Sequence, residues 1–403
     1  MELLQASADG KLEVKPTGKS IVKAMGPLPE PHTLQLSNLD LLSGRFPFTY
    51  FYFYRRPFGK NYPLIIQTLR ISLAKTLNFY YPFAGRIIQN PQTNEPEIIC
   101  DKNGALVLEA EANIPLVNLD FYNLNESLQG KLVSIQPDFP LQIQVTSYTC
   151  GGISITFSFD HALGDASSFG KFLVSWSEIA QQKPITCSPD LRRNLRARFP
   201  PSYHPSLDQT FVKCTIEEIS NIPPTNILLK RFYHIDASSI SRLQQLASVN
   251  GKKRTKVEAF SAYIWKIMVT SIDEKHGNRI LKYENLMSSY IGNVLSLAVG
   301  EASCHRPGLM LARVVLGRDG PAVLMSSGRR FPVVELDFGF GSPVLGAVSS
   351  IIERSGVGYI NQRPSAKCDG SWTVSAILWP ELATALESDF IFQPMSSADH
   401  LQL

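Results

Sequence analysis

A histidine and an aspartate four positions apart occur together in the middle of the chain, in the segment His161-Ala162-Leu163-Gly164-Asp165. A neutral imidazole, with an ordinary pKa of about 6.5, can take a proton from a hydroxyl or an amine near pH 7. Gly164 lets the backbone turn sharply. Asp165 stands where a following helix would begin, so its carboxylate can cap free N–H groups. The pattern predicts a general base at His161.

The same motif also has an ordinary explanation. If each of the two residue types makes up about 6% of the chain, chance gives roughly 0.4 matches to this spacing. An aspartate at a helix start is also commonly a plain N-cap. The placement of the motif directly after an alternating strand favours the functional interpretation.

The elements on either side of the motif should place His161 at the exit of a strand. Residues 141–159 predict a hairpin, because apolar and polar residues alternate on both sides of Gly151-Gly152. His161 keeps the parity of the alternating aromatic residues but lies beyond them, where a side chain can reach a cleft. A helix is expected next, since five apolar residues fall on one face: Phe169, Phe172, Leu173, Trp176 and Ile179.

Further strands and helices are expected in both halves of the chain. Residues 184–204 are rich in Pro, Ser and Arg and predict a linker. We therefore expect a mixed α/β (α+β) protein with two domains, 1–183 and 205–403, and a substrate site at their interface. The expected elements are helices at 63–77 and 238–247, strands at 97–100, 105–108 and 232–235, and a helix opened by the capping box Thr255-x-x-Glu258.

Composition excludes several classes of protein. The 403 residues carry a net charge of +4, with 44% hydrophobic and 18% charged residues, which argues against a nucleic-acid binder and against global disorder. No apolar run approaches the roughly 20 residues of a membrane span, and the first residues do not resemble a secretion signal. Six scattered cysteines without a CxxC pair indicate reduced thiols and no metal site. We expect a cytoplasmic monomer.

A second motif, Asp337-Phe338-Gly339-Phe340-Gly341, predicts a tight backbone path rather than a regular strand. It is not a kinase element, because no His-Arg-Asp loop precedes it and no Gly-rich loop with a strand lysine opens the chain. There is also no G-x-S-x-G nucleophile elbow and no Walker loop. The sequence therefore lacks the motifs that usually indicate a serine hydrolase or a P-loop NTPase.

Together the two motifs resemble the paired signatures of the plant BAHD acyl-CoA-dependent acyltransferases. The resemblance covers nearly the whole chain, because other sequence segments similar to those of the family follow in the same order. These are LSNLDL at 36–41, YPFAGR at 81–86, residues 158–169, VEAFSAYIW at 257–265 and YIGN at 290–293. It implies two chloramphenicol-acetyltransferase-like domains with a central channel at their interface. Acyl-CoA would be a co-substrate, with no permanently bound cofactor.

The resemblance also implies roles for single residues. His161 would deprotonate a hydroxyl or amine as that atom attacks the thioester. Asp165 would have a structural, orienting role and pair with an arginine, for which Arg279 is the nearest candidate. Ser326 stands nearest to the position of an oxyanion donor found in some members, although a surface serine is the simpler explanation.

The second signature would be a structural loop, with Asp337, Gly339 and Gly341 as its key residues. Lys252, Lys253 and Arg254, followed by Thr255 at a helix start, could receive the phosphates of CoA; a solvated basic loop explains them equally well.

Some features depart from the family pattern. Phe340 replaces a tryptophan, a segment usually found before Arg279 is missing, and so is a helical stretch between Ser303 and Cys304. If these are true deletions, activity is in question. Alternatives are a non-catalytic binding protein of the same fold, or an enzyme that uses the cleft for condensation or cyclisation.

The substrate is less defined than the reaction. The aromatic residues Phe46, Phe48, Tyr50, Phe51 and Tyr52 suggest an aromatic alcohol as acceptor, although core packing explains them equally well. Hydroxycinnamoyl and small acyl donors both stay open.

Overall fold

The computed structural model covers all 403 residues. The structure describes residues 11–27, 29–37, 40–41, 45–57, 59–93, 95–132, 135–191, 213–214, 228–248, 253–270, 310–311, 323–350 and 358–401. Lys252, Arg279, residues 290–293 and Ser303–Cys304 lie outside the described residues, as does most of the expected linker.

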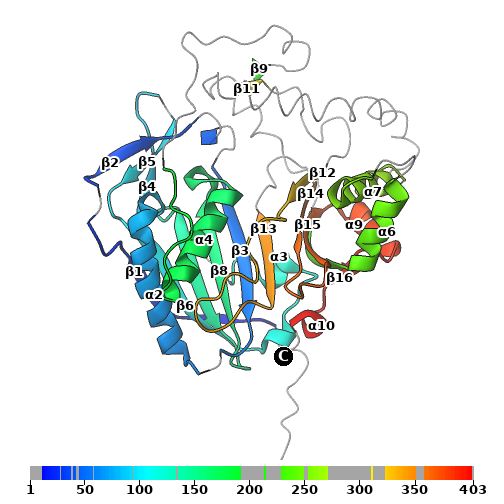
Figure 1. Ribbon diagram of the computed structural model, residues 1–403, viewed down its shortest axis with the longest axis horizontal. Helices are drawn as coiled ribbons and strands as arrows, with labels where there is room; N and C mark the ends of the chain where they lie inside the picture. The colour runs from blue at the N-terminus through cyan, green and yellow to red at the C-terminus, as the bar shows by residue number, and fades with distance from the viewer. Residues whose placement is uncertain are drawn as a thin grey trace, which may run out of the picture.

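A large mixed sheet forms the first half of the molecule (Figure 1). All neighbouring strands in it are antiparallel except β6 and β7. In the described chain it has six strands, in the spatial order β1 (Val14–Val22), β6 (Ala105–Ala112), β7 (Leu141–Ser147), β8 (Ile153–Asp160), β3 (Pro47–Tyr54) and β13 (Leu345–Ser350).

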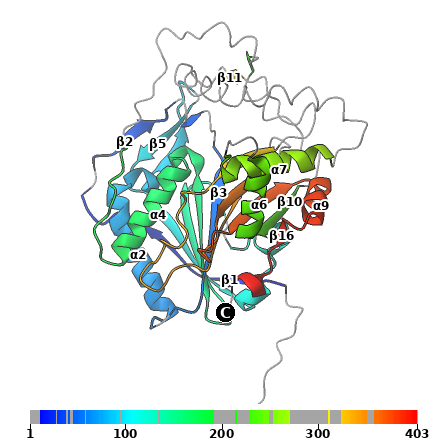
Figure 2. The ribbon, with the colours of Figure 1, turned by 45° about the vertical axis from the view of Figure 1, so that its right-hand side comes forward.

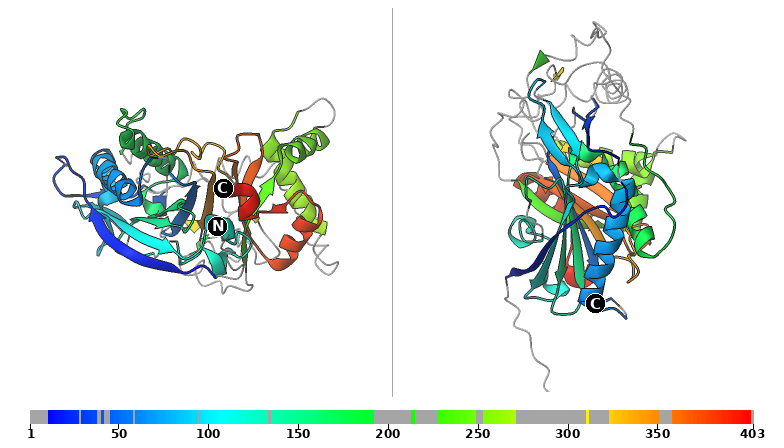
Figure 3. Two further views of the ribbon diagram at one scale, coloured as in Figure 1. Left: turned by 90° about the horizontal axis from the view of Figure 1, so that it is seen from below. Right: turned by 90° about the vertical axis from the view of Figure 1, so that its left-hand side faces the viewer.

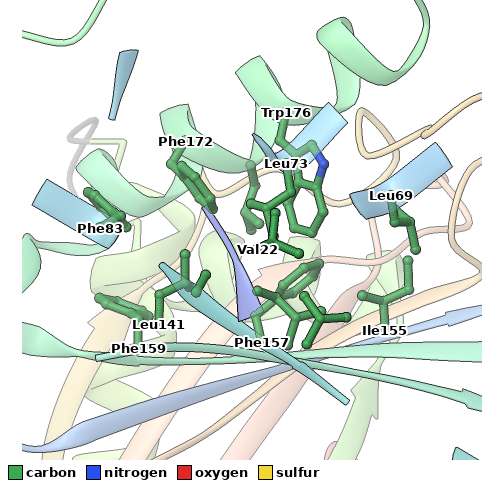
Figure 4. Packing of buried hydrophobic residues seen from close by; sticks show 14 of the residues in the cluster. Val22, Leu69, Leu73, Phe83, Leu141, Ile155, Phe157, Phe159, Phe172 and Trp176 are labelled. Atoms are coloured by element: carbon green, nitrogen blue, oxygen red, sulfur yellow. The ribbon is translucent and has the colours of Figure 1, made fainter. Parts of the chain in front are cut away.

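Two long helices cover one face of this sheet. They are α2 (Tyr62–Phe79) and α4 (Ala166–Ala180), and the predicted hairpin and both predicted helices are confirmed. Their apolar stripes point at the alternating residues of the strands, because every second strand residue faces the same side. Figure 4 shows this contact, with Phe172 and Trp176 of α4 above Phe157 and Phe159 of β8.

Several short elements complete this half. A three-stranded sheet contains β2 (His32–Gln35), β5 (Pro96–Cys100) and β4 (Arg86–Gln89). The remaining short helices are η1 (Tyr81–Ala84), η2 (Leu116–Asn118), α3 (Leu124–Ser127) and η3 (His161–Leu163).

The second half of the chain builds a smaller sheet with helices grouped beside it (Figure 2). Within the described residues its strands are β12 (Val323–Ser327), β14 (Gly358–Pro364), β15 (Trp372–Leu378), β10 (Leu229–Ile235) and β16 (Gln393–Pro394). The helices are α6 (Ala237–Ala247), α7 (Lys256–Thr270), α9 (Pro380–Ser388) and α10 (Ser397–Leu401). Two short strands, β9 (Lys213–Cys214) and β11 (Met310–Leu311), pair apart from both large sheets.

The two halves are joined by a segment of the second that packs on the first. Strand β13 pairs with β3 along its whole length, and the Val348 N–H donates to Ser375 Oγ on β15 at 3.1 Å. The Tyr52 hydroxyl on β3 donates to the Pro332 carbonyl at 2.8 Å. The helices of the two halves therefore lie toward opposite ends of the molecule with the sheets between them (Figure 3).

Two further expectations concern membrane spans and the cysteines. Among the described helices, none is long and apolar enough to cross a membrane. The described cysteines Cys100, Cys150, Cys187 and Cys368 are free thiols.

Candidate active site

His161 lies at the point where β8 ends and the first turn of helix begins. Its backbone N–H donates to the Phe46 carbonyl at 3.0 Å, and the preceding Asp160 N–H donates to the Pro140 carbonyl at 2.8 Å. Asp160 then caps η3, because its Oδ1 accepts from the Ala162 N–H at 2.9 Å. The backbone that carries the imidazole is therefore held on both sides.

Asp160 is in turn bound by an arginine that the sequence analysis did not identify. Arg45 donates to Asp160 Oδ2 through Nε at 3.0 Å and through Nη2 at 2.8 Å. The pair links the end of β8 to the start of β3. Only the tertiary fold brings these two residues together, and no local pattern indicates the contact.

Aromatic rings surround the His161 side chain. The Phe46 ring stacks on it with centroids 4.9 Å apart at 18°, and the Phe48 ring lies 5.3 Å away. Nδ1 is buried and has no hydrogen-bond partner among the residues that the structure describes. Because Nδ1 is closed off, Nε2 is the nitrogen left to exchange a proton with a substrate.

Burial lowers the pKa of His161 below its ordinary value, and the carboxylates of Asp165, Asp160 and Asp40 oppose that shift. Desolvation penalises the charged imidazolium, so the neutral ring dominates at pH 7. The neutral ring is the form that accepts a proton from an incoming nucleophile.

Asp165 begins α4 as an N-cap, as predicted. Its Oδ1 accepts from the Ser168 N–H at 2.8 Å, and the residue is exposed. Its expected partner Arg279 lies outside the described residues. Within the described part, Asp165 contributes a helix cap and a charge that acts on His161.

Gly164 has a different role from the predicted one. Its φ of 165° and ψ of 172° are extended, so no left-handed turn requires glycine here. A Cβ at this position would instead lie 2.9 Å from Ser168 Cβ. Glycine is needed at 164 because the motif packs closely against the first turn of α4. A sharp turn of the backbone does not explain it.

The second motif forms a closed loop at the other end of α4. Asp337 Oδ1 accepts from the N–H groups of Gly339 at 2.7 Å, Phe340 at 3.0 Å and Gly341 at 2.9 Å. Both glycines have positive φ, 86° and 108°, which explains their type. The Asp337 carbonyl accepts from the Gln181 side chain, just beyond α4.

The length of α4 separates the two motifs. The 15 residues of the helix correspond to about 22 Å, with His161 before its start and the loop at its end. Phe340, in place of the family's tryptophan, packs edge-on against Tyr54 at 5.3 Å. The loop geometry is that of a packing element remote from His161.

The second half of the chain presents a row of polar groups on β12 and β14. Ser326 is partly buried and pairs in register with Asn361, so the two side chains leave the sheet on the same side. The Asn361 side chain accepts from Arg363 Nε at 2.8 Å. Arg363 lies over the Tyr50 ring of the first half, with Cζ 4.8 Å from its centroid.

The proposed CoA residues open α7. The capping box is confirmed, since the Thr255 N–H donates to Glu258 Oε2 at 2.7 Å and the Glu258 N–H donates to Thr255 Oγ1 at 3.1 Å. Lys253 and Arg254 are exposed beside it. The box satisfies the Thr255 and Glu258 N–H groups, and the two cationic side chains are the charged groups left to attract phosphate here.

The aromatic residues in and just before β3 divide into two groups. Phe51 and Tyr52 are 3% and 0% exposed and fill the cores on the two faces of the sheet. Phe46 and Phe48 are only partly buried and touch His161. Core packing therefore explains the first pair, and the second pair belongs to the surroundings of the imidazole.

The chain thus combines two α/β halves with an imidazole at the exit of a central strand. A sequence model described as "Transferase family" matches residues 12–306 and 296–392. The chain belongs to this family, that of the plant BAHD acyl-CoA-dependent acyltransferases. It is accordingly an acyltransferase.

Curated relatives agree with this assignment. Omega-hydroxypalmitate O-feruloyl transferase of Arabidopsis thaliana is 27% identical over 346 residues, 72% of this chain and 74% of that protein. Vinorine synthase of Rauvolfia serpentina is 25% identical over 422 residues, covering 90% and 96%. Benzyl alcohol O-benzoyltransferase of Petunia hybrida is 26% identical over 384 residues, covering 81% and 80%.

Solved structures show the same fold. The crystal structure of vinorine synthase has a TM-score of 0.65 at 19% identity and covers 96% of this chain and 100% of its own. The structure of F. graminearum TRI101 complexed with coenzyme A and T-2 mycotoxin has a TM-score of 0.67 at 14% identity, covering 90% and 99%.

Proposed function

We propose that the chain transfers an acyl group from acyl-CoA to a hydroxyl or amine of a plant specialised metabolite, with His161 as general base. The observation that carries this proposal is the imidazole itself: its backbone is held by β3, its Nδ1 is buried and its pKa is lowered by burial. Such a ring is neutral, oriented and ready to accept a proton.

The reaction needs no covalent enzyme intermediate. His161 Nε2 takes the proton of the acceptor as the acceptor oxygen or nitrogen attacks the thioester carbonyl. The tetrahedral intermediate then releases the CoA thiolate, to which the imidazolium returns the proton. The new bond is an ester or an amide, and the other product is CoA with a free thiol.

The negative oxygen of the tetrahedral intermediate requires a hydrogen-bond donor. Such a donor often lowers the activation free energy by about 3 kcal/mol. Ser326 is our candidate. Its support is its place beside Asn361 in the polar row that faces the first half of the molecule.

The CoA phosphates would meet Lys252, Lys253 and Arg254 before Thr255. Binding there would draw on the charge of these side chains and depend on salt, since the capping box occupies the Thr255 and Glu258 N–H groups. Acyl-CoA is a co-substrate in this scheme, and the structure of TRI101 is a complex with coenzyme A.

For the acceptor we infer an aromatic alcohol. The support is the pair of rings, Phe46 and Phe48, beside His161, together with the aromatic substrate named for the Petunia hybrida relative. Hydroxycinnamoyl and small acyl donors are both compatible with this proposal.

We further propose that the protein is a cytoplasmic monomer, and that its domains comprise residues 1–183 and 205–403 with 184–204 as the linker. The orienting role of Asp165 and its pairing with Arg279 belong to the same proposal.

A matrix of acyl-CoA donors against alcohols and amines, read by mass spectrometry and by release of free CoA thiol, tests the function.

His161→Ala should reduce turnover by about 10²- to 10⁴-fold without loss of folded protein. His32→Ala, which removes an imidazole from β2, is the matched control. Undiminished turnover in His161→Ala would refute the base, and no thiol release with any pair would favour a non-catalytic protein. A product whose mass is not that of a simple ester or amide would indicate condensation or cyclisation.

A further inference from the structure

The Asp160 carboxylate joins an arginine to the turn that carries His161. Its Oδ2 accepts from Arg45 Nε at 3.0 Å and from Nη2 at 2.8 Å, and its Oδ1 accepts from the Ala162 N–H at 2.9 Å. Each oxygen thus has a different partner. The carboxylate therefore connects the chain before β3 with η3, through hydrogen bonds that its charge strengthens.

This connection lies at the end of a strand pair. The register of β3 and β8 ends with Pro47 opposite Asp160, and just beyond it the His161 N–H donates to the Phe46 carbonyl at 3.0 Å. The ends of paired segments are where a structure opens most easily. The Arg45 side chain fastens the two segments at that point.

Phe46, the residue that follows Arg45, contacts His161 in two ways. Its carbonyl accepts the backbone N–H, and its ring stacks on the imidazole with centroids 4.9 Å apart at 18°. A shift of the segment that contains Arg45 would therefore move the surface on which the imidazole rests. The orientation of the base depends on where this segment is held.

Stability does not give the ion pair its main importance. The Arg45 and Asp160 side chains are 39% and 13% exposed, and ion pairs that water reaches contribute little to the stability of a fold. Both residues are instead direct chain neighbours of residues that define the site: Arg45 precedes Phe46, and Asp160 precedes His161. We therefore looked for the effect of the pair at the imidazole.

The pair also affects the charge around the base. Among the described residues, the carboxylates of Asp165, Asp160 and Asp40 oppose the lowering of the His161 pKa by burial. Arg45 places a positive charge beside one of these carboxylates, so it offsets part of the effect of Asp160 on the ring. Without the guanidinium, the imidazolium would be more stable and the pKa of His161 would be higher.

We propose that Arg45 is a positioning residue for acyl transfer: through Asp160 it holds the Phe46 segment against the His161 turn and balances a negative charge beside the ring. The proposal rests on the acyltransferase function given above. Arg45 acts through Asp160 and needs no contact with a substrate. A general base must lie within hydrogen-bond reach of the proton that it takes, and a displacement of about 1 Å can greatly reduce the rate.

The first test is kinetic and uses Arg45→Met, which removes the charge and the donors. At the pH where the base is fully neutral, kcat should fall by roughly tenfold, while the KM for acyl-CoA should stay within about twofold. Arg45→Lys returns the charge with a different geometry and should recover part of the loss. Arg86→Met is the matched control, because Arg86 of β4 also donates through Nε and Nη2 to a single oxygen, that of Asp101. This control should leave kcat per folded molecule unchanged.

The pH profile distinguishes a positioning role from a merely structural one. Arg45→Met leaves the Asp160 charge unopposed, so the acid limb of kcat should move to a pH about 0.5 higher. Asp160→Asn keeps an oxygen for the Ala162 N–H but removes the charge. The neutral imidazole is then favoured, and the limb should move to lower pH. General destabilisation would not produce opposite shifts from the two partners of one ion pair.

A titration without substrates separates this proposal from the acyltransferase function. NMR of isotope-labelled histidine side chains follows the pKa of His161, whose signal is assigned by its loss in His161→Ala. The two opposite shifts should appear even if no donor–acceptor pair is turned over.

Three results would overturn the proposal. The first is a kcat of Arg45→Met equal to that of the wild type. The second is a His161 titration that Arg45→Met and Asp160→Asn leave unchanged or shift in the same direction. The third is a loss of activity that follows a lower melting temperature with an unmoved acid limb, which would assign the pair to stability alone.

Discussion

The two ends of α4 carry the two sequence motifs, and they differ in how far their polar groups are satisfied. At the C-terminal end, one Asp337 oxygen accepts three backbone N–H groups and the loop closes on itself. At the N-terminal end, the backbone around His161 is equally well held, but the Nδ1 atom of the ring has no partner in the described part of the chain.

This difference separates structure from chemistry. A loop whose groups all satisfy one another gains stability and has nothing left for a ligand. A side chain held in place by its backbone, with one ring nitrogen buried and unsatisfied, costs stability, and its other nitrogen remains available for reaction. Two motifs of similar prominence in the sequence therefore have opposite roles, and the following substitutions test that contrast.

The largest effect on stability is expected for Asp337→Ala. Losing three hydrogen bonds to a carboxylate should cost about 3 kcal/mol in the free energy of unfolding, with kcat per folded molecule unchanged. Urea unfolding with parallel kinetics measures both quantities. Asp337→Asn keeps the accepting oxygen and should lose less. A fall in kcat at unchanged stability would move the loop into the chemistry and contradict the contrast.

Gly164→Ala should have the next largest effect. Its Cβ would lie 2.9 Å from Ser168 Cβ, so the turn that carries His161 must shift, at an expected cost of about 1–3 kcal/mol together with lower kcat. Ser168→Gly in the same chain removes the clash and should restore kcat, measured by CoA thiol release. If kcat does not recover in the double variant, the close contact is not the reason for glycine at 164.

Local patterns in the sequence predicted most of the secondary structure around His161 and at the start of α7. They could not predict the long-range contacts. Alternation and helical periodicity indicated the 141–159 hairpin and α4, and Thr255-x-x-Glu258 indicated the capping box, because each involves neighbours in sequence. The Arg45–Asp160 pair joins residues 115 positions apart, and neither residue carries a local sign of it.

The same limit explains β13 and Arg363. Nothing in Leu345–Ser350 indicates that this strand joins the sheet of the first half beside β3. Arg363 lies in β14 among polar neighbours and would pass for a surface residue, yet it is buried beside Gly328, where no side chain intervenes, and beneath two rings from distant segments. Burial of a charge is a property of the tertiary structure.

Asp165→Ala should have a moderate effect on stability. Removing the N-cap leaves the Ser168 N–H without its acceptor and should cost about 1 kcal/mol. Asp165→Ser supplies another capping oxygen and should recover most of it, which thermal unfolding can measure. If the two variants are equally destabilised, the capping bond does not account for the aspartate.

The smallest effect is a change in pH dependence. The Asp165 charge raises the pKa of His161 against the larger lowering by burial. Asp165→Asn keeps a capping oxygen but removes that charge, so the pKa should fall further. Because the neutral imidazole is the active form, activity is lost as the pH falls through this pKa. The acid limb of kcat/KM should therefore lie below the ordinary histidine value in the wild type and move to still lower pH in the variant. A shift of the limb to higher pH would mean that Asp165 acts on His161 through some contact other than its charge.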